Sequence, residues 1–313
     1  MTPPSPQLAR GWAAWRWPLV LLLLTALTTT LAQGPMAGAS WAQGTAYAAT
    51  LLGILGAHEM GHFVAARYLG VPASPPHFIP LPPLPPPLPA FSLGTLGAVI
   101  RMDAGPAARG PLLIIGAAGP LAGFLVAVPA MILGLQLSTP TPLESTEGLV
   151  FFGSSLISWG LEAAFAPPVG PGEELFVHPV YIAAWAGFLV TALNLLPMGQ
   201  LDGGHIVHAL WPSKAHLVAR VAQVCLLVLG VSGLLVNATE WWDLEWARSV
   251  AFLRPWLSPG LLLWAGLATW LGLEHPPTPD DDRSLTALHH VLAGACLVVL
   301  VGCFMPSPIY TMP

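Results

Sequence analysis

The sequence predicts an all-α polytopic membrane protein with about six to seven transmembrane helices. Three observations predict this class. Hydrophobic residues make up 55% of the 313 residues and charged residues only 8%. Apolar runs of nearly the length that a helix needs to cross a bilayer recur along the chain. The 35 prolines and 32 glycines lie among apolar residues, which favours broken helices and rigid loops over disorder.

Seven apolar runs are the expected spans, and they lie at residues 17–31, 46–70, 111–137, 179–197, 215–236, 257–273 and 285–304. A secretory signal peptide is the competing interpretation of the first run, because Ala-Gln-Gly follows it. We favour a retained span, because it gives a consistent topology. Residues 149–165 and the tryptophan-rich 238–256 are expected to lie on the membrane surface.

A proline-dense segment, residues 71–90, separates the second span from a short glycine-containing stretch. Its ten prolines exclude a helix and predict a stiff, extended spacer; a ligand for an SH3-like partner is the alternative. The stretch that follows, FSLGTLGAVIRM, carries Gly94 and Gly97 between β-prone residues. It predicts a small re-entrant β-hairpin near residues 91–103, with an open edge.

The basic residues predict the orientation of the chain. With the N-terminus in the cytoplasm and seven spans, eight of the ten basic residues fall on the cytoplasmic side, as the positive-inside rule expects. Three regions follow: a cytoplasmic tail at 1–16, a membrane-embedded core at 17–210, and further transmembrane helices at 211–313. We expect a multi-pass protein of the bacterial inner membrane. The lipid bilayer is then one partner, and the net charge of −5 gives no reason to expect nucleic acid.

The motif that carries chemistry is HEMGH at residues 58–62, inside the second apolar run. On a helix, positions i and i+4 share a face, so His58 and His62 can bind one metal ion. Glu59 lies beside them, where it can take a proton from a metal-bound water. Five residues can match this pattern by chance. Ionisable groups in an apolar span are costly, however, and this favours a functional site.

A catalytic zinc site needs a third protein ligand, and Asp202 is the best candidate. It lies in NLLPMGQLDGGH, where Pro197 ends the preceding span and glycines let the backbone bend. The alternative is that Asp-Gly-Gly is only a turn. His205 and His208 are alternative candidates for the third ligand, or else they contact the ligands without touching the metal. The three cysteines show no C-x-x-C spacing and indicate small buried side chains.

The order HEMGH, GTLGA, GPLAG, NLLPMGQLDGGH resembles the site-2 protease family of intramembrane zinc metalloproteases. The resemblance covers roughly residues 50–210. It implies that His58, His62 and Asp202 bind one Zn²⁺ ion and that Glu59 is the catalytic base. It also implies that Asn194 helps to position the substrate or to stabilise the oxyanion. Many members carry a PDZ domain; this chain has no room for one and is similar to a PDZ-less subgroup.

The expected activity is hydrolysis of peptide bonds within or near the transmembrane segments of other membrane proteins. The substrate helix must unwind, and the strand with Gly94 and Gly97 would hold it by its edge. We expect the site to open towards the cytoplasm. The alternatives are a zinc transporter or sensor, a catalytically silent scaffold, and a prenyl-protein-type zinc protease.

Overall fold

The computed structural model describes residues 11–82, 93–102, 108–142, 150–238, 257–273, 275, 278 and 284–311. Most of these residues are helical. The helices are η1 (Gly11–Ala14), α1 (Arg16–Gln33), η2 (Pro35–Ala37), α2 (Trp41–Tyr68), α3 (Arg109–Leu137), α4 (Leu156–Phe165), α5 (Pro179–Asn194), α6 (Asp202–Leu210), α7 (Ala215–Ala238), α9 (Gly260–Leu271) and α10 (Ala287–Cys303). The strands are β1 (His77–Pro80), β2 (Thr95–Val99), β3 (Thr139–Pro142), β4 (Val150–Phe152), β5 (Glu173–Phe176) and β6 (Ile309–Thr311).

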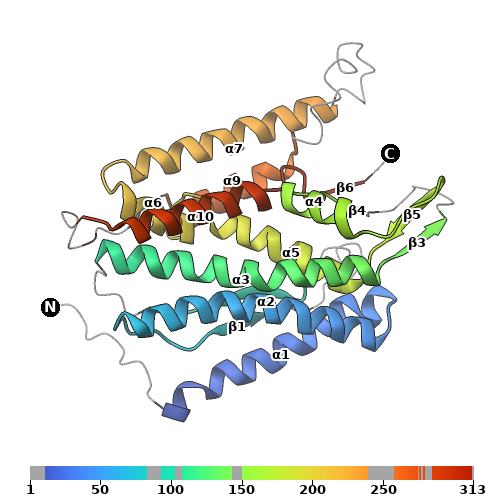
Figure 1. The fold of residues 1–313 in the computed structure, drawn as a ribbon, viewed down its shortest axis with the longest axis horizontal. Coiled ribbons are helices and arrows are strands. Elements are labelled where there is room, and N and C mark those ends of the chain that lie inside the picture. The colour runs from blue at the N-terminus through green and yellow to red at the C-terminus, as the bar shows by residue number, and fades with distance from the viewer. Residues whose placement is uncertain are drawn as a thin grey trace.

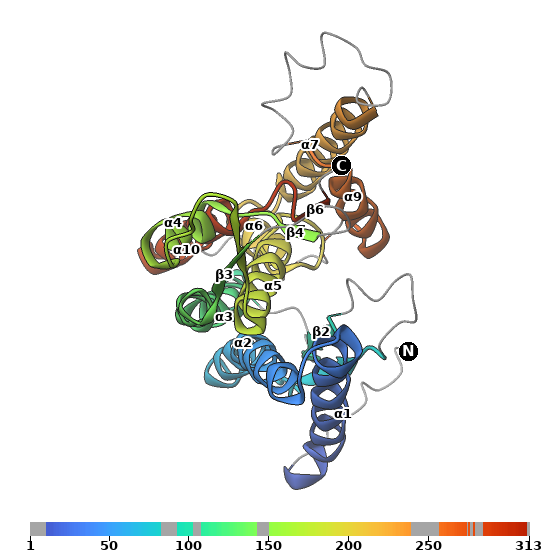
Figure 2. The ribbon, with the colours of Figure 1, turned by 90° about the vertical axis from the view of Figure 1, so that its right-hand side faces the viewer.

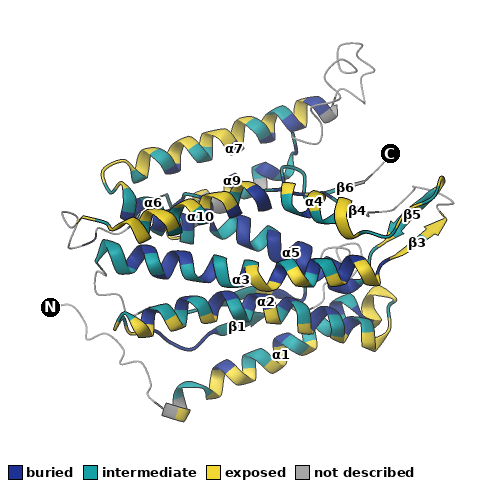
Figure 3. Cartoon of the chain, in the orientation of Figure 1, coloured by how far each residue is buried: buried dark blue, intermediate teal, exposed yellow. Residues whose placement is uncertain are grey.

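The long helices lie side by side with their axes roughly aligned (Figure 1). Helix α2 lies between α1 and α3, and α6 joins α3 to α7, as the view along the helices also shows (Figure 2). The core forms where α2, α3 and α5 meet. Its largest buried side chains include Ile54, Leu113, Met131, Trp185 and Phe188. Burial is therefore greatest in the middle of the stack, whereas α1 and α7 expose much of their surface (Figure 3).

Three of the described helices are long and apolar enough to cross a membrane: α1, α3 and α7. Helices α5 and α10, of 16 and 17 residues, are apolar but shorter. Helix α2 has 28 residues, which span about 42 Å at 1.5 Å per residue, but it is less apolar than those three. The count of six to seven spans therefore stays a prediction.

Local signals explain where the central helices begin. Ser40 and Gln43 form a capping box, in which each side chain bonds to the other residue's backbone N–H, and α2 starts directly after Ser40. Helix α5 starts at Pro179, whose missing N–H costs nothing at a first helical position. His178 caps the same helix, because its ring accepts a hydrogen bond from the Val180 N–H.

The first sheet corrects the expected hairpin. Strand β2 lies within residues 91–103 as expected, but its antiparallel partner is β1, from the segment expected to be a proline-rich spacer. The register pairs His77 with Val99 and Phe78 with Ala98, and a bulge precedes the pair Pro80–Thr95. Helix α1 packs against this sheet, and Thr28 Oγ1 donates a hydrogen bond to the Gly94 carbonyl at 2.7 Å.

Two further segments extend or correct the sequence-based expectation. Residues 149–165, expected to lie on the membrane surface, contain strand β4 and helix α4, and β5 follows them; β5 pairs with β3, and β4 pairs with β6. The stretch that begins at Asp202 is not only a turn, because α6 starts there and runs for nine residues. The expected surface helix at 238–256 lies outside the described residues, apart from its first residue.

Candidate metal centre

The two motif histidines project from one face of α2 into the packed interior. His58 and His62 are one helical turn apart, and only 4% and 7% of their surfaces are exposed. Their Nε2 atoms lie 3.1 Å apart. Two imidazoles so close and so well buried need a shared partner, because neither ring reaches bulk water.

Asp202 supplies that partner from a distant part of the sequence. Its carboxylate lies 3.2 Å from His58 Nε2 through Oδ2 and 3.3 Å from His62 Nε2 through Oδ1. The glycines after it allow this approach. A Cβ atom on Gly203 would collide with the Leu195 carbonyl, and one on Gly204 with the Gly199 carbonyl. The chain can therefore turn back tightly between α5 and α6 and begin α6 with a carboxylate.

The three side chains have the composition and spacing of a metal site. Their ligand atoms lie within 4.8 Å of one another, so together they could hold one metal ion. A tetrahedral zinc ion with bonds of about 2.0–2.1 Å has ligand atoms roughly 3.3 Å apart. The separations of 3.1, 3.2 and 3.3 Å fit this spacing. The third donor is an aspartate, whereas a prenyl-protein-type protease would use a glutamate.

A backbone carbonyl determines which ring nitrogen of His62 carries the proton. His62 Nδ1 lies 2.8 Å from the carbonyl oxygen of Ile115 on α3. A carbonyl can only accept a hydrogen bond, so Nδ1 carries the proton and Nε2 keeps its lone pair. The lone pair faces His58 and Asp202. Such a hydrogen bond from the outer nitrogen is the usual way to orient a metal-binding imidazole.

Glycines on α3 make room for the histidines. A Cβ atom on Gly119 would overlap the His62 ring at Nε2, and one on Gly123 would lie 3.1 Å from His58 Cβ. On α2, a Cβ atom on Gly61 would collide with the Ala118 carbonyl. The small residues of GPLAG therefore let α2 and α3 approach each other closely. Larger residues at these positions would push α2 and α3 apart.

Glu59 and Asn194 flank the three donors. Glu59 is 8% exposed, and the backbone of Ile100, which directly follows β2, lies near its carboxylate. The end of the sheet therefore lies beside the candidate base. Asn194, the last residue of α5, brings its amide nitrogen within 3.3 Å of His58 Nε2. An amide donor beside the histidines is suited to hold a carbonyl oxygen.

The other residues singled out from the sequence lie elsewhere. Gly94 packs against α1, where a Cβ atom would collide with Thr29, and Gly97 lies within β2 with open space on its Cβ side. His205 Nδ1 lies 2.6 Å from His275 Nε2, and burial lowers the pKa of His205 to about 4. The His208 ring stacks on the His275 ring. The roles of these glycines in substrate binding, and of His205 beside the ligands, stay predictions.

Sequence reasoning missed three supports of the site. The Ile115 carbonyl and the Ile100 backbone are main-chain groups, which no residue type reveals. The third is Arg109 at the start of α3, whose Nε donates to the Ala209 carbonyl at 2.8 Å and whose Nη2 donates to the Leu210 carbonyl at 3.1 Å. These carbonyls belong to the last two residues of α6, so Arg109 holds the C-terminal end of the helix that begins with Asp202. The sequence feature that could have indicated this role is an arginine placed directly before an apolar span.

The model of peptidase family M50 matches residues 46–236, which include all three donors. The chain belongs to peptidase family M50. This is the site-2 protease family, so the resemblance drawn from the four motifs is confirmed.

Curated relatives agree with this assignment. The chain is 32% identical over 190 residues to "Probable zinc metalloprotease EGY2, chloroplastic" of Oryza sativa subsp. indica, covering 60% of this chain and 33% of that protein. It is 33% identical over 187 residues to "Probable zinc metalloprotease EGY1, chloroplastic" of Arabidopsis thaliana, covering 58% and 32%. The chain thus spans about a third of the length of these relatives. No solved structure matches it.

Proposed function

We propose that this M50 chain is an intramembrane zinc metalloprotease that cuts peptide bonds within or near transmembrane segments of other membrane proteins. The observation that carries the proposal is the convergence of His58, His62 and Asp202 at zinc-like spacing, with Glu59 beside them. Family membership supports it, as do relatives whose names describe zinc metalloproteases. One Zn²⁺ ion is the proposed cofactor.

Each residue has a defined part in the proposed reaction. When bound, zinc makes a coordinated water acidic enough to lose a proton near pH 7 and polarises the substrate carbonyl. Glu59 takes the proton of that water and returns it to the nitrogen of the leaving amine. Ile100 lies near the Glu59 carboxylate and helps to position it. Asn194 donates its amide N–H to the developing oxyanion.

Substrate recognition is proposed to use the sheet of β1 and β2. A transmembrane helix hides its carbonyls in internal hydrogen bonds, so the substrate must unwind before its carbonyl can reach the site. An unwound segment can add to the edge of a sheet by backbone hydrogen bonds. Strand β2 leads directly into Ile100, which lies near Glu59. A substrate strand held along β2, near Gly97, would therefore run towards the base.

We further propose that the site faces the cytoplasmic side of a bacterial inner membrane, with residues 1–16 in the cytoplasm and residues 211–313 adding transmembrane helices to a core at 17–210. The start of α1, the end of α2 and the starts of α3 and α7 lie at one end of the stack (Figure 1). Arg16, Arg67, Arg109 and Lys214 belong to these helix ends, and basic residues favour the cytoplasmic face.

The experiment that tests the activity separates proton transfer from metal binding. Glu59→Gln keeps the shape of the side chain and removes the base. The purified variant is expected to hold as much zinc as the wild type and to lose cleavage of single-span substrates in liposomes by at least about 100-fold. Cleavage at the wild-type rate would exclude Glu59 as the base. A zinc transporter would move zinc across the liposome membrane equally well in both proteins.

A further inference from the structure

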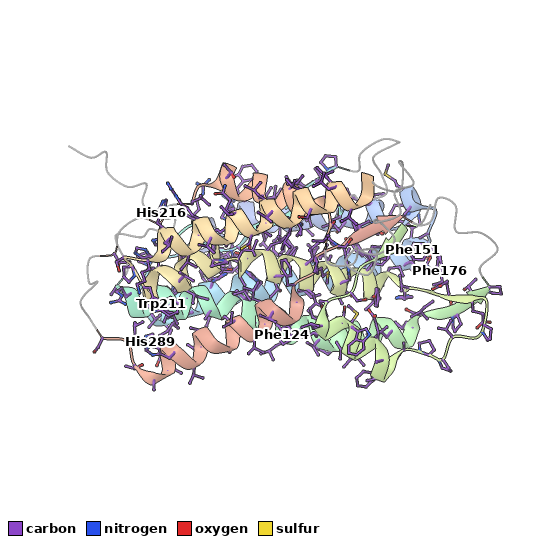
Figure 4. All side chains as sticks on the ribbon, turned by 90° about the horizontal axis from the view of Figure 1, so that it is seen from above. Phe124, Phe151, Phe176, Trp211, His216 and His289 are labelled. Carbon is purple, nitrogen blue, oxygen red and sulfur yellow. The ribbon has the colours of Figure 1, made fainter. Side chains whose placement is uncertain are left out.

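Four histidines gather where α6, α7 and the segment after α9 meet. His205 and His208 lie on α6, His216 lies in the first turn of α7, and His275 follows α9. Figure 4 shows His216 at the same end of the molecule as Trp211, which directly follows α6. The proposed protease reaction uses none of these four side chains.

Three of the rings contact one another. His205 Nδ1 lies 2.6 Å from His275 Nε2, and the two rings meet edge to face with centroids 4.8 Å apart. The His275 ring also stacks on His208, with centroids 4.2 Å apart and an angle of 17° between the ring planes. His275 therefore joins two side chains that lie nearly one turn apart on α6.

A cavity of about 210 Å³ lies beside two of these rings, those of His208 and His275. His208, His216 and His275 contribute to its wall, and the remaining lining is proline, glycine, alanine, valine and leucine. Among the described residues that line it, there is no carboxylate, amide or hydroxyl side chain. Imidazole nitrogens are thus the polar side-chain groups that a small guest in this cavity would meet.

We propose that His205, His208, His216 and His275 form a second metal site that takes a transition-metal ion such as Zn²⁺, Cu²⁺ or Ni²⁺. Neutral imidazoles suit these ions, whereas Mg²⁺ and Ca²⁺ require oxygen ligands, which the described lining side chains do not offer. The site is separate from His58, His62 and Asp202, and it does not depend on the protease reaction.

Binding requires a small rearrangement of one side chain. Two imidazole nitrogens on a tetrahedral ion lie roughly 3.3 Å apart, so the His205–His275 pair must open from its 2.6 Å contact. Stacked rings hold their nitrogens in nearly parallel planes, so His275 must also turn away from His208 to share an ion with it. His275 lies outside the helices and lines the cavity.

A metal ion in this second site would affect the position of Asp202, because both are attached to the same stretch of backbone. The cavity is also lined by Pro197, Gly199 and Gly204, which belong to the turn before Asp202 and to the first turn of α6. A Cβ atom on Gly199 would collide with the Gly272 carbonyl, so the segment after α9 already packs on this turn. An ion bridging His275 and α6 would hold the turn in place.

The test counts metal ions in a chain whose catalytic centre has been removed. The full chain with His58→Ala and His62→Ala is purified in detergent, stripped with a chelator and equilibrated with Zn²⁺. Elemental analysis is expected to find one ion per chain. The same background with His208→Ala and His275→Ala is expected to bind none. His290→Ala, an exposed histidine on α10, is the control and should leave the count at one.

Cu²⁺ provides a second readout. Electron paramagnetic resonance of the His58→Ala/His62→Ala chain should show couplings to at least three imidazole nitrogens. His275→Gln alone, outside the helices, should reduce this number and weaken binding at least about tenfold. The proposal is overturned if the background chain binds no ion, or if it keeps its ion and its couplings after His275 and His208 are replaced. Neither result bears on Glu59 or on cleavage.

Discussion

Helices α3 and α7 look alike in sequence and differ in what they do. Both are long and apolar. In the most apolar stretch of each helix, half of the residues of α3 are buried, whereas only 22% of those of α7 are buried. Helix α3 presents Gly119, Gly123 and the Ile115 carbonyl to the histidines of α2. Helix α7 exposes a stripe that includes Val221, Val224 and Val228, which suits contact with lipid.

The comparison shows that hydrophobicity alone does not distinguish a helix that shapes the site from one that faces lipid. The difference lies in how closely the backbone of each helix approaches the backbone of its neighbour. On α3, missing side chains let two helices touch at the level of the metal ligands. Substitutions on α3 should therefore act on zinc binding, and those on the exposed face of α7 should not.

The largest effect is expected from Gly119→Ala. The added methyl group would occupy the position of the His62 ring at Nε2, so the ring must move away from its partners. Zinc affinity should fall at least about 100-fold, and cleavage should fall with it. Gly53→Ala is the matched control, because a Cβ atom on this α2 glycine meets no atom within 4 Å. Equal zinc affinity in the two variants would refute the role assigned to α3.

A smaller effect is expected from Arg109→Ala. The change removes two hydrogen bonds to the last carbonyls of α6 and loosens the helix that begins with Asp202. Zinc affinity should fall about tenfold, as for other groups that orient a ligand from outside. Arg220→Ala, an exposed arginine on α7, serves as the control in the same zinc titration. If both variants bind zinc like the wild type, Arg109 does not position α6.

The smallest effect is expected from a matched pair of valines. Val180 on α5 is 5% exposed and Val228 on α7 is 57% exposed. Val180→Ala should lower the free energy of unfolding by about 1 kcal/mol, because it leaves a cavity in the packed interior. Val228→Ala should change it by less than about 0.5 kcal/mol. Chemical denaturation in detergent compares the two, and equal losses would contradict the contrast between the helices.

The sequence was sufficient to predict that His58, His62 and Asp202 lie together, and the reason is chemical. Helical spacing places His58 and His62 on one face of α2, and the count of spans predicts Asp202 on the same side of the membrane as His62. It was not sufficient for strand pairing, because the partner of β2 lies across a proline-dense segment, where composition indicates an extended chain but no register. It also missed α6, because Asp-Gly-Gly has the composition of a turn and the helix is held by packing.

The most direct test of the central claim is a zinc titration of Asp202→Asn. The substitution removes the charge and keeps the size, so the chain should still fold. Both proteins carry His208→Ala and His275→Ala, so that only the His58–His62–Asp202 centre is measured. The account predicts zinc binding at least about 100-fold weaker in Asp202→Asn, with cleavage lost. Equal zinc affinity in the two proteins would contradict it, because the third ligand would then lie elsewhere.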